Sequence, residues 1–417
     1  MPERRKHQQA STLLVGAGVV GREIARCHLA AGLPFTLVDQ DPKQLELVQK
    51  ELFGDACYAA GLVDSVTGPH KLGYCIDFRS DADSRTASQP TMVIESISEH
   101  LEVKQEFFQR AQAIFGESAV YCSNTSNLQI QQIAAGLEFP ERLCGMHFFM
   151  PVQARQAVEI ASGLGSDRET IYQAISHVLR LNKQPIQVED SPGFIVNRLL
   201  SPYLNEAMQL LCRGVSPRAI DRAAKRYGMP ISPLELIDWI GTRTAFDAGR
   251  VFWRAFPKRL CPAPLLPALL KKGRSGRFAG GGFYDYIDGR RSMDVAEETT
   301  DLIQQYQCQS PIIDEQQVML RLAVPMWIEA VLARLDGVIG STSELDLAMR
   351  GGLGFDSKRT WSTFFDRLGS DAILQSINRW SAITSSMNAP EFVITRLRQM
   401  TPSEVIDLGR RRPAHVA

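Results

Sequence analysis

The sequence has no excess of either charge. Its 417 residues contain 46 lysines and arginines against 46 aspartates and glutamates, which gives a formal net charge of +0 at pH 7. Proteins that bind nucleic acid or anionic membranes over a broad surface need a basic excess, so we exclude both kinds of partner. No apolar run reaches the roughly 20 residues of a membrane-spanning helix. The basic start, MPERRKHQQAS, lacks the apolar stretch of a signal peptide. We therefore expect neither a membrane-spanning helix nor a signal peptide.

Cysteine is scarce and scattered. The eight cysteines stand singly, with no CxxC spacing and no Cys/His cluster, so we expect no metal site. Reduced thiols in a cytoplasmic protein are the simplest interpretation. Hydrophobic residues make up 44% and charged residues 22%, which at this length indicates two or three globular domains.

The first part of the chain alternates short apolar runs with helical stretches. This order is typical of a parallel sheet with helices on both faces. We therefore predict a Rossmann-type α/β domain with a mainly parallel sheet over residues 1–189. The runs predicted as strands are 12–15, 35–39, 92–94, 119–122 and 143–147, and the predicted helices include 20–31 and 101–115.

From about residue 190 the pattern changes to long helical periodicities. Several residues recur there in register, which predicts two related all-α domains. The first helical copy spans 190–286, a linker spans 287–310, and a second, degenerate helical copy spans 311–417. Two unrelated amphipathic helices are the alternative. The matched pairs are Arg198 and Arg321, Leu199 and Leu322, Pro202 and Pro325, Glu206 and Glu329, Ala207 and Ala330, Gly214 and Gly337, and Asp221 and Asp346.

The segment GAGVVG follows the first predicted strand and opens the first predicted helix, and Asp39 ends the next strand. This context completes the fingerprint of a dinucleotide site. Its glycines allow the tight turn, the approach of the pyrophosphate and helix–strand packing, and the helix start favours phosphates. Asp39 would accept hydrogen bonds from ribose hydroxyls and repel a 2′-phosphate, so we predict NAD as cofactor. The alternative is a glycine turn in an α/β protein that binds no ligand. The cofactor-binding residues in this motif are Gly16, Gly18, Val19, Val20 and Gly21.

Six further motifs occur in one order along the chain and resemble the signatures of L-3-hydroxyacyl-CoA dehydrogenases. The resemblance covers residues 12–286 closely and 311–417 loosely. The duplicated helical part is similar to the dehydrogenase portion of multifunctional fatty-acid oxidation proteins, whose hydratase domain is absent here. The motifs are VIESISE from Val93, EVKQ from Glu102, SNTS from Ser123, GMHFFMP from Gly145, DSPGFIVNR from Asp190 and GFY from Gly282.

The chemistry of alcohol oxidation points to a base and its partner. Oxidising a secondary alcohol requires a base for the hydroxyl proton and donors for the oxygen that becomes a carbonyl. Among seven histidines we select His147 as that base, because it follows a predicted strand at the ligand-binding end of the sheet. Glu159, on the next apolar segment, would orient the imidazole as the acid of a triad does. The alternative is a packed histidine at a strand end.

The resemblance implies roles for five other residues. Ser126 and Asn197 match residues that contact the substrate oxygen or the nicotinamide, while Glu99, Lys104 and Asn124 match positions that line the cofactor. Structural roles are the alternatives: a helix N-cap for Ser126, a solvated helix residue for Asn197, and a surface ion pair for Glu99 with Lys104. We expect Phe148 and Phe149 to belong to the core.

Three departures from the family pattern concern the substrate. Met150 replaces the asparagine of His-Phe-Phe-Asn-Pro, Phe278 stands where the glycine-rich loop usually has a lysine, and Lys71 and Arg79 are the only basic candidates for CoA in the region 50–80.

Three functions therefore stay open. The first is the NAD-dependent oxidation of an L-3-hydroxyacyl-CoA to the 3-ketoacyl-CoA, or its reverse. The second is an NAD-dependent dehydrogenase of another hydroxy acid, and the third is a nucleotide-binding scaffold for hydratase or thiolase partner proteins. We expect an acyl-CoA substrate, and we expect the two helical copies to pair within one chain, as single helical domains pair between subunits in shorter members of the family.

Overall fold

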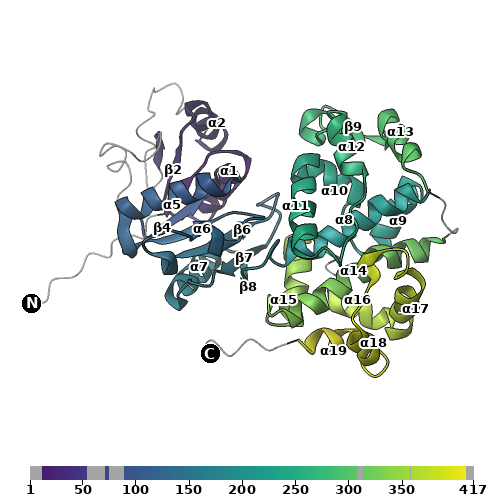
Figure 1. The fold of residues 1–417 in the computed structure, drawn as a ribbon. Helices are drawn as coiled ribbons and strands as arrows, with labels where there is room; N and C mark the ends of the chain where they lie inside the picture. The colour runs from purple at the N-terminus through teal and green to yellow at the C-terminus, as the bar shows by residue number, and fades with distance from the viewer. Residues whose placement is uncertain (1–11, 54–70, 75–88, 309–312, 357, 410–417) are drawn as a thin grey trace, which may run out of the picture. The chain divides into compact units, whose positions relative to one another are not determined.

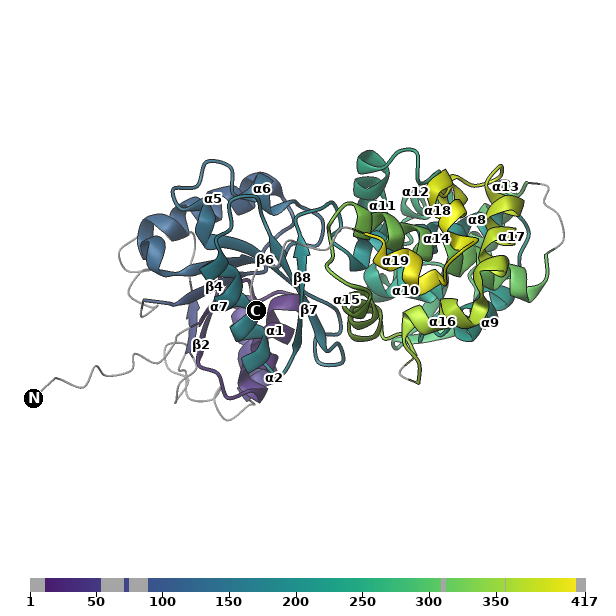
Figure 2. The same cartoon turned by 90° about the horizontal axis from the view of Figure 1, so that it is seen from below.

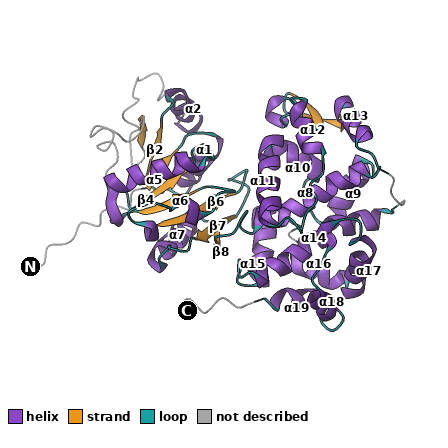
Figure 3. Cartoon of the chain, viewed as in Figure 1, coloured by secondary structure: helices purple, strands orange, loops and turns teal. Residues whose placement is uncertain are grey.

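The computed structural model describes residues 12–53, 71–74, 89–308, 313–356 and 358–409 (Figure 1). The chain forms two compact units, Met1–Asp190 and Ser191–Ala417, which we describe separately. Strands gather in the first unit, and helices make up almost all of the second (Figure 3). Among the described residues, no helix has both the length and the apolar character needed to cross a membrane.

The first unit contains an eight-stranded sheet with the order β3-β2-β1-β4-β5-β6-β7-β8. All neighbouring strands are parallel except β6 and β7, which are antiparallel, so the predicted mainly parallel Rossmann-type sheet is confirmed. The strands are β1 (Thr12–Val15), β2 (Phe35–Asp39), β3 (Lys71–Tyr74), β4 (Met92–Glu95), β5 (Val120–Ser123), β6 (Leu143–Phe148), β7 (Ala157–Ser162) and β8 (Gln184–Glu189).

Helices cover both faces of this sheet. Helices α1 and α7 lie on one face, and α5 and α6 lie on the other (Figure 2). The central strands are apolar and buried because both of their faces are covered. The helical elements of this unit are α1 (Val19–Ala30), α2 (Pro42–Phe53), α5 (Leu101–Phe115), η1 (Gly116–Ser118), α6 (Ile130–Ile133), η2 (Pro140–Arg142) and α7 (Arg168–Arg180).

Two histidines meet in the core between α1 and α7. The Nε2 atoms of His28 and His177 are 2.9 Å apart, and Nδ1 of His28 is 2.9 Å from the carbonyl oxygen of Ile24. Burial lowers the pKa of His177 well below its ordinary value, and the positive charges of His28 and Arg180 lower it further. The folded chain therefore holds His177 in its neutral form.

This pair predicts a loss of stability in mild acid. The unfolded chain binds the proton near pH 6.5, but the folded chain binds it only at much lower pH, so stability falls by roughly 1.4 kcal/mol per pH unit below about pH 6.5. Urea unfolding at a series of pH values checks this. His177→Gln should show a shallower dependence than the wild type, and identical curves would refute the assignment.

The second unit is built around two long helices, α8 (Val196–Cys212) and α14 (Glu315–Leu335), which pack against each other. The further elements are α9 (Pro217–Tyr227), α10 (Pro233–Ile240), α11 (Thr242–Ala255), α12 (Leu265–Lys271), η3 (Arg277–Ala279), β9 (Tyr284–Ile287), β10 (Arg290–Val295), α13 (Glu297–Gln305), α15 (Thr342–Leu347), η4 (Ala348–Leu353), α16 (Trp361–Leu368), α17 (Ser370–Trp380), η5 (Ser385–Met387), α18 (Glu391–Leu397) and α19 (Pro402–Asp407).

Positions matched by the sequence repeat hold matching conformations. Pro202 lies inside α8, and Pro325 lies inside α14. Soon after each helix ends, Gly214 and Gly337 take positive φ values of 81° and 76°. The repeat extends to side-chain contacts between α8 and α14.

The stretch 287–310, predicted as a linker from its polar composition, contains strand β10 and helix α13. The reason is that a few small and apolar side chains, Ala296, Thr299 and Leu302, are buried at regular spacing within an otherwise polar sequence.

Candidate active site

The glycine turn between β1 and α1 is closely packed. Gly16 has φ of +98°, and a Cβ there would lie 2.6 Å from the carbonyl oxygen of Ser96. A Cβ on Gly21 would lie 1.8 Å from the carbonyl oxygen of Gly16. Around Gly18, by contrast, there is open space, and as N-cap of α1 it supplies no side-chain hydrogen bond. The free N–H groups of the helix start therefore suit the phosphates of a dinucleotide.

Asp39, at the end of β2, holds this turn. Its Oδ2 accepts a hydrogen bond from the backbone N–H of Ala17 at 2.6 Å, and its Oδ1 accepts one from Asp41 N–H at 2.8 Å. A carboxylate has about four lone-pair positions, so these two bonds leave acceptor capacity for ribose hydroxyls. The residues present therefore fit the adenosine half of NAD.

Asp39 predicts a strong preference for NAD over NADP. A 2′-phosphate next to this carboxylate should weaken binding by roughly a hundredfold, because two like charges in a partly desolvated site repel by a few kcal/mol. Calorimetric titration measures both affinities. Asp39→Ala should narrow the gap in affinity, while Asp41→Ala, which removes a neighbouring half-buried carboxylate, should not. Equal affinities in the wild type would remove Asp39 from this role.

His147 and Glu159 face each other across the only antiparallel strand pair of the sheet's described strands. They are direct partners in the register of β6 and β7, so their side chains lie on the same face. His147 Nδ1 is 2.7 Å from Glu159 Oε2, with 9% and 0% of the two side chains exposed. Because a carboxylate only accepts hydrogen bonds, Nδ1 carries the hydrogen and Nε2 is the atom that can take a proton.

The end of β6 is held from two sides. Phe149, which is buried, packs edge-on against the His147 ring with centroids 4.8 Å apart. Asn124 Oδ1 accepts a hydrogen bond from the Phe148 backbone N–H at 2.8 Å. Phe148 is buried too, as expected of a core residue. These contacts fix the strand end that presents the imidazole, and they give Asn124 a structural contact besides its predicted place at the cofactor.

Glu99 organises the loop that carries Ser126. Its Oε1 accepts hydrogen bonds from Thr125 Oγ1 at 2.7 Å and from Ser126 N–H and Oγ at 2.9 and 3.3 Å. Burial raises the pKa of Glu99, but Lys104 and these donors, with Asn127 N–H, outweigh burial and lower it overall. Glu99 is therefore an anion that fixes the Ser126 hydroxyl.

Lys104 is not a surface residue. It is 1% exposed, and its Nζ lies 2.5 Å from Glu95 Oε1 and 3.4 Å from Glu99 Oε2. Glu95, fully buried at the end of β4, also accepts from Ser123 Oγ at 2.7 Å. This rules out an exposed Glu99–Lys104 pair. Sequence reasoning missed Glu95, although its position after a buried strand was a usable signal.

The other predicted residues are not among the contacts described for this cluster. Asn197 is in the first turn of α8, in the second unit, so the fold of the first unit alone does not bring it to His147. Met150 is 42% exposed, and Phe278 is 82% exposed. Lys71 falls in β3, where its side chain is outside the described parts, and Arg79 lies outside the described residues.

Two aspartates have structural contacts, one within the DSPGFIVNR motif and one that contacts the Gly-Phe-Tyr motif. Asp190 accepts hydrogen bonds from the N–H groups of Ile130 and Gln131 at 2.9 and 2.8 Å, which caps α6. In the second unit, Asp238 accepts from Phe283 N–H at 2.6 Å, and a Cβ on Gly282 would overlap its carboxylate. Burial raises the pKa of Asp238 to about 6. The Gly-Phe-Tyr motif therefore encloses a buried carboxyl.

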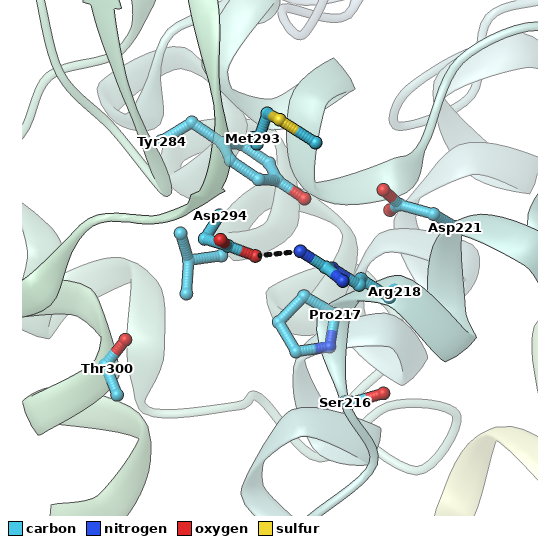
Figure 4. A pocket seen from close by; sticks show the side chains of 9 residues that line it. Ser216, Pro217, Arg218, Asp221, Tyr284, Met293, Asp294 and Thr300 are labelled. Atoms are coloured by element: carbon cyan, nitrogen blue, oxygen red, sulfur yellow. Dashed lines mark hydrogen bonds and ion pairs between the residues drawn. The ribbon is translucent and has the colours of Figure 1, made fainter.

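A pocket of about 280 Å³ lies in the second unit, between the start of α9 and the β9–β10 hairpin (Figure 4). The ion pair of Arg218 with Asp294, 2.9 Å long, crosses it. The buried Tyr284 hydroxyl faces it and has no hydrogen-bond partner among the described residues. None of the predicted site residues is among those that line this pocket. No cluster of metal-binding side chains occurs in the described parts of the chain.

Comparison with known proteins gives the same family twice. The model of the 3-hydroxyacyl-CoA dehydrogenase NAD-binding domain matches residues 12–191, and that of the 3-hydroxyacyl-CoA dehydrogenase C-terminal domain matches residues 193–286.

Solved structures agree. The (S)-3-hydroxybutyryl-CoA dehydrogenase of Ralstonia eutropha is 30% identical, with a TM-score of 0.56 over 67% of this chain and 99% of its own. The 3-hydroxybutyryl-CoA dehydrogenase of Escherichia coli is 23% identical, with a TM-score of 0.75 over 94% of this chain and 98% of its own. The dehydrogenase part of multifunctional enzyme 1 from C. elegans is 22% identical, with a TM-score of 0.62 over 96% and 89%.

The glycine turn, the fold and both family matches lead to one conclusion: this chain belongs to the 3-hydroxyacyl-CoA dehydrogenase family and is an oxidoreductase that acts on a CH–OH group with NAD.

Proposed function

We propose that this protein oxidises an L-3-hydroxyacyl-CoA to the 3-ketoacyl-CoA, or catalyses the reverse reduction, with His147 as the base. The observation that supports this role is the buried 2.7 Å contact between His147 Nδ1 and Glu159 Oε2. It sets the tautomer in which Nε2 accepts the hydroxyl proton, and the carboxylate stabilises the imidazolium that forms.

The remaining groups act on the substrate oxygen. Asp39 and the glycine turn would hold NAD, which would supply the acceptor for the hydride of the carbinol carbon while His147 takes the hydroxyl proton, so that the alcohol would lose two electrons and two hydrogens in all. Ser126, fixed by Glu99, donates to the oxygen as it becomes a carbonyl, and the resemblance gives Asn197 the same task. Lys104, which is paired with Glu95, also holds Glu99 in place through its second ion pair.

The test is a panel of 3-hydroxyacyl-CoAs of increasing chain length and of free hydroxy acids, with NADH formation as the readout. Turnover of acyl-CoAs alone supports the proposal. Turnover of free acids alone would establish the second function, another hydroxy-acid dehydrogenase. NAD binding with no turnover of any substrate would favour the third, a scaffold for hydratase or thiolase partners. We also propose a cytoplasmic location, because reduced thiols are typical of that compartment. The six described cysteines are all free thiols, and four of them are buried.

Met150 predicts slow turnover of ordinary short substrates. It lies three residues after the base, where an amide would offer two donors and an acceptor. One hydrogen bond lost in a preorganised site should lower turnover roughly ten- to a hundredfold. Met150→Asn should raise turnover on a short 3-hydroxyacyl-CoA if the defect is local, and lower it on a native apolar substrate if Met150 selects that substrate. No effect on the whole panel would make Met150 a packing residue.

A further inference from the structure

Helices α8 and α14 exchange two buried ion pairs. Arg198 on α8 donates from Nε to Glu329 on α14, and Arg321 on α14 donates from Nε to Glu206 on α8 at 2.8 Å. At most 4% of any of these four side chains is exposed. The two pairs link positions that the sequence repeat matches, so each is the counterpart of the other.

The aromatic neighbours are also matched. The Arg198 guanidinium lies 4.6 Å from the centroid of Phe256, just after α11, and that of Arg321 lies 4.9 Å from the centroid of Trp380, at the end of α17. In size, burial and chemistry, the Arg321–Glu206 pair is therefore a natural control for the Arg198–Glu329 pair.

The surroundings of the two glutamates differ. Glu206 accepts additional hydrogen bonds from Thr384 Oγ1 and Ser386 Oγ, both at 2.6 Å. Glu329 takes a second cation instead, because Arg259 Nη1 lies 3.0 Å from its Oε1. Burial raises the pKa of Glu329, and Arg198 and Arg259 oppose that rise.

Arg198 ties the start of α8 to the second helical copy. It follows Asn197 directly, and its backbone N–H donates to the Gly193 carbonyl at 3.2 Å. Its Nη1 donates to Ser191 Oγ at 3.3 Å, and its Nη2 donates to Asp336, the residue just after α14. Helix ends fray unless such contacts hold them. Glu329 and Asp336 are the anions that hold Arg198 in this position.

We propose that Glu329 is a positioning residue for the dehydrogenase reaction: through Arg198 it fixes the helical turn that carries Asn197. The second helical copy then contributes to turnover, although the position that matches Asn197 in it is Leu320. This inference rests on the role proposed for Asn197. Glu206 lies about two and a half turns further along α8, too far along the helix to act on that turn in the same way.

The experiment compares Glu329→Gln with Glu206→Gln in the full-length protein. Both changes keep the side-chain shape and remove one buried charge, so both should lower the melting temperature. Glu329→Gln should lower kcat about tenfold, because Asn197 acts on the oxygen whose charge changes in the transition state, and should leave the KM for NAD unchanged. Glu206→Gln should leave kcat within about twofold. Glu329→Asp should recover part of the loss.

A double-mutant cycle tests the route through Asn197. In an Asn197→Ala background, Glu329→Gln should add less than about a twofold loss, because the group it positions is gone. Equal kcat losses in the two glutamine variants, or a full additional loss in that background, would overturn the inference. If Glu329→Gln fails to fold, Asp336→Asn, which changes the half-exposed partner of Arg198, takes its place with about a threefold loss expected.

Amide hydrogen exchange gives a readout without substrate. Residues 194–198 should exchange faster in Glu329→Gln than in Glu206→Gln, and equal exchange would count against the inference. A wild type that turns over no substrate would refute the proposed function, and the exchange measurement alone would then decide the role of Glu329.

Discussion

His147→Gln is expected to abolish nearly all turnover, with a fall in kcat of about 10²- to 10⁴-fold, the usual contribution of a general base. Glutamine keeps a polar side chain next to Glu159 but cannot take up the hydroxyl proton. NAD affinity should stay close to that of the wild type, because the substitution leaves unchanged the glycine turn between β1 and α1, where we expect the phosphates to bind. Steady-state kinetics and calorimetry on one preparation measure both quantities.

Two further variants serve as comparisons for His147→Gln. His100→Gln changes an exposed histidine before α5 and should behave like the wild type. Glu159→Gln should reduce kcat less than His147→Gln does, because the base remains but the imidazolium that forms loses its anionic partner. A His147→Gln protein with normal turnover of its true substrate would end the catalytic assignment.

Deletion of residues 305–417 is expected to cause dimerisation or aggregation. Removing α14 would uncover the face of α8 that packs against it, and α8 is buried along most of its length. It would also leave Arg198 without Glu329 and Glu206 without Arg321, each a buried charge that has lost its partner. A second truncated chain supplies both partners at once, since its own Arg198 and Glu206 can pair with them reciprocally.

Sedimentation of the truncated protein tests this pairing. Glu206→Arg in the truncated chain places like charges opposite each other and should shift the dimer to monomer or to insoluble material. A truncated protein that stays soluble, monomeric and as stable as the full chain would contradict the proposed pairing of the two helical copies within one molecule.

Much of the first unit follows from its sequence. The apolar strands and the glycine turn were predictable because buried parallel strands are short apolar runs and a dinucleotide turn needs glycine at fixed positions. Strand β8, QPIQVE, was not predicted, since it is an edge strand whose burial alternates. Strand β3, KLGY, also escaped prediction, because four residues with a glycine carry little periodicity.

The candidate site was predictable in its residue types but not in its contacts. A twelve-residue separation does not fix a contact between His147 and Glu159; that contact requires β7 to run antiparallel to β6 in one register. The burial of Lys104 and the carboxylates of Glu95 and Asp190 depend on which strand ends adjoin in the sheet. Such partners are non-local, and no single segment of sequence contains them.

The antiparallel pairing of β6 and β7 also affects the energetics of proton transfer. Both members of the proposed dyad belong to one hydrogen-bonded sheet, so their separation does not depend on any movement of a loop or of the other unit. The imidazole thus has its orientation before a substrate arrives, and the reorganisation cost at that atom is met during folding rather than during each turnover. Variation in kcat among substrates should then reflect how the acyl chain is seated, with proton abstraction contributing a nearly constant share.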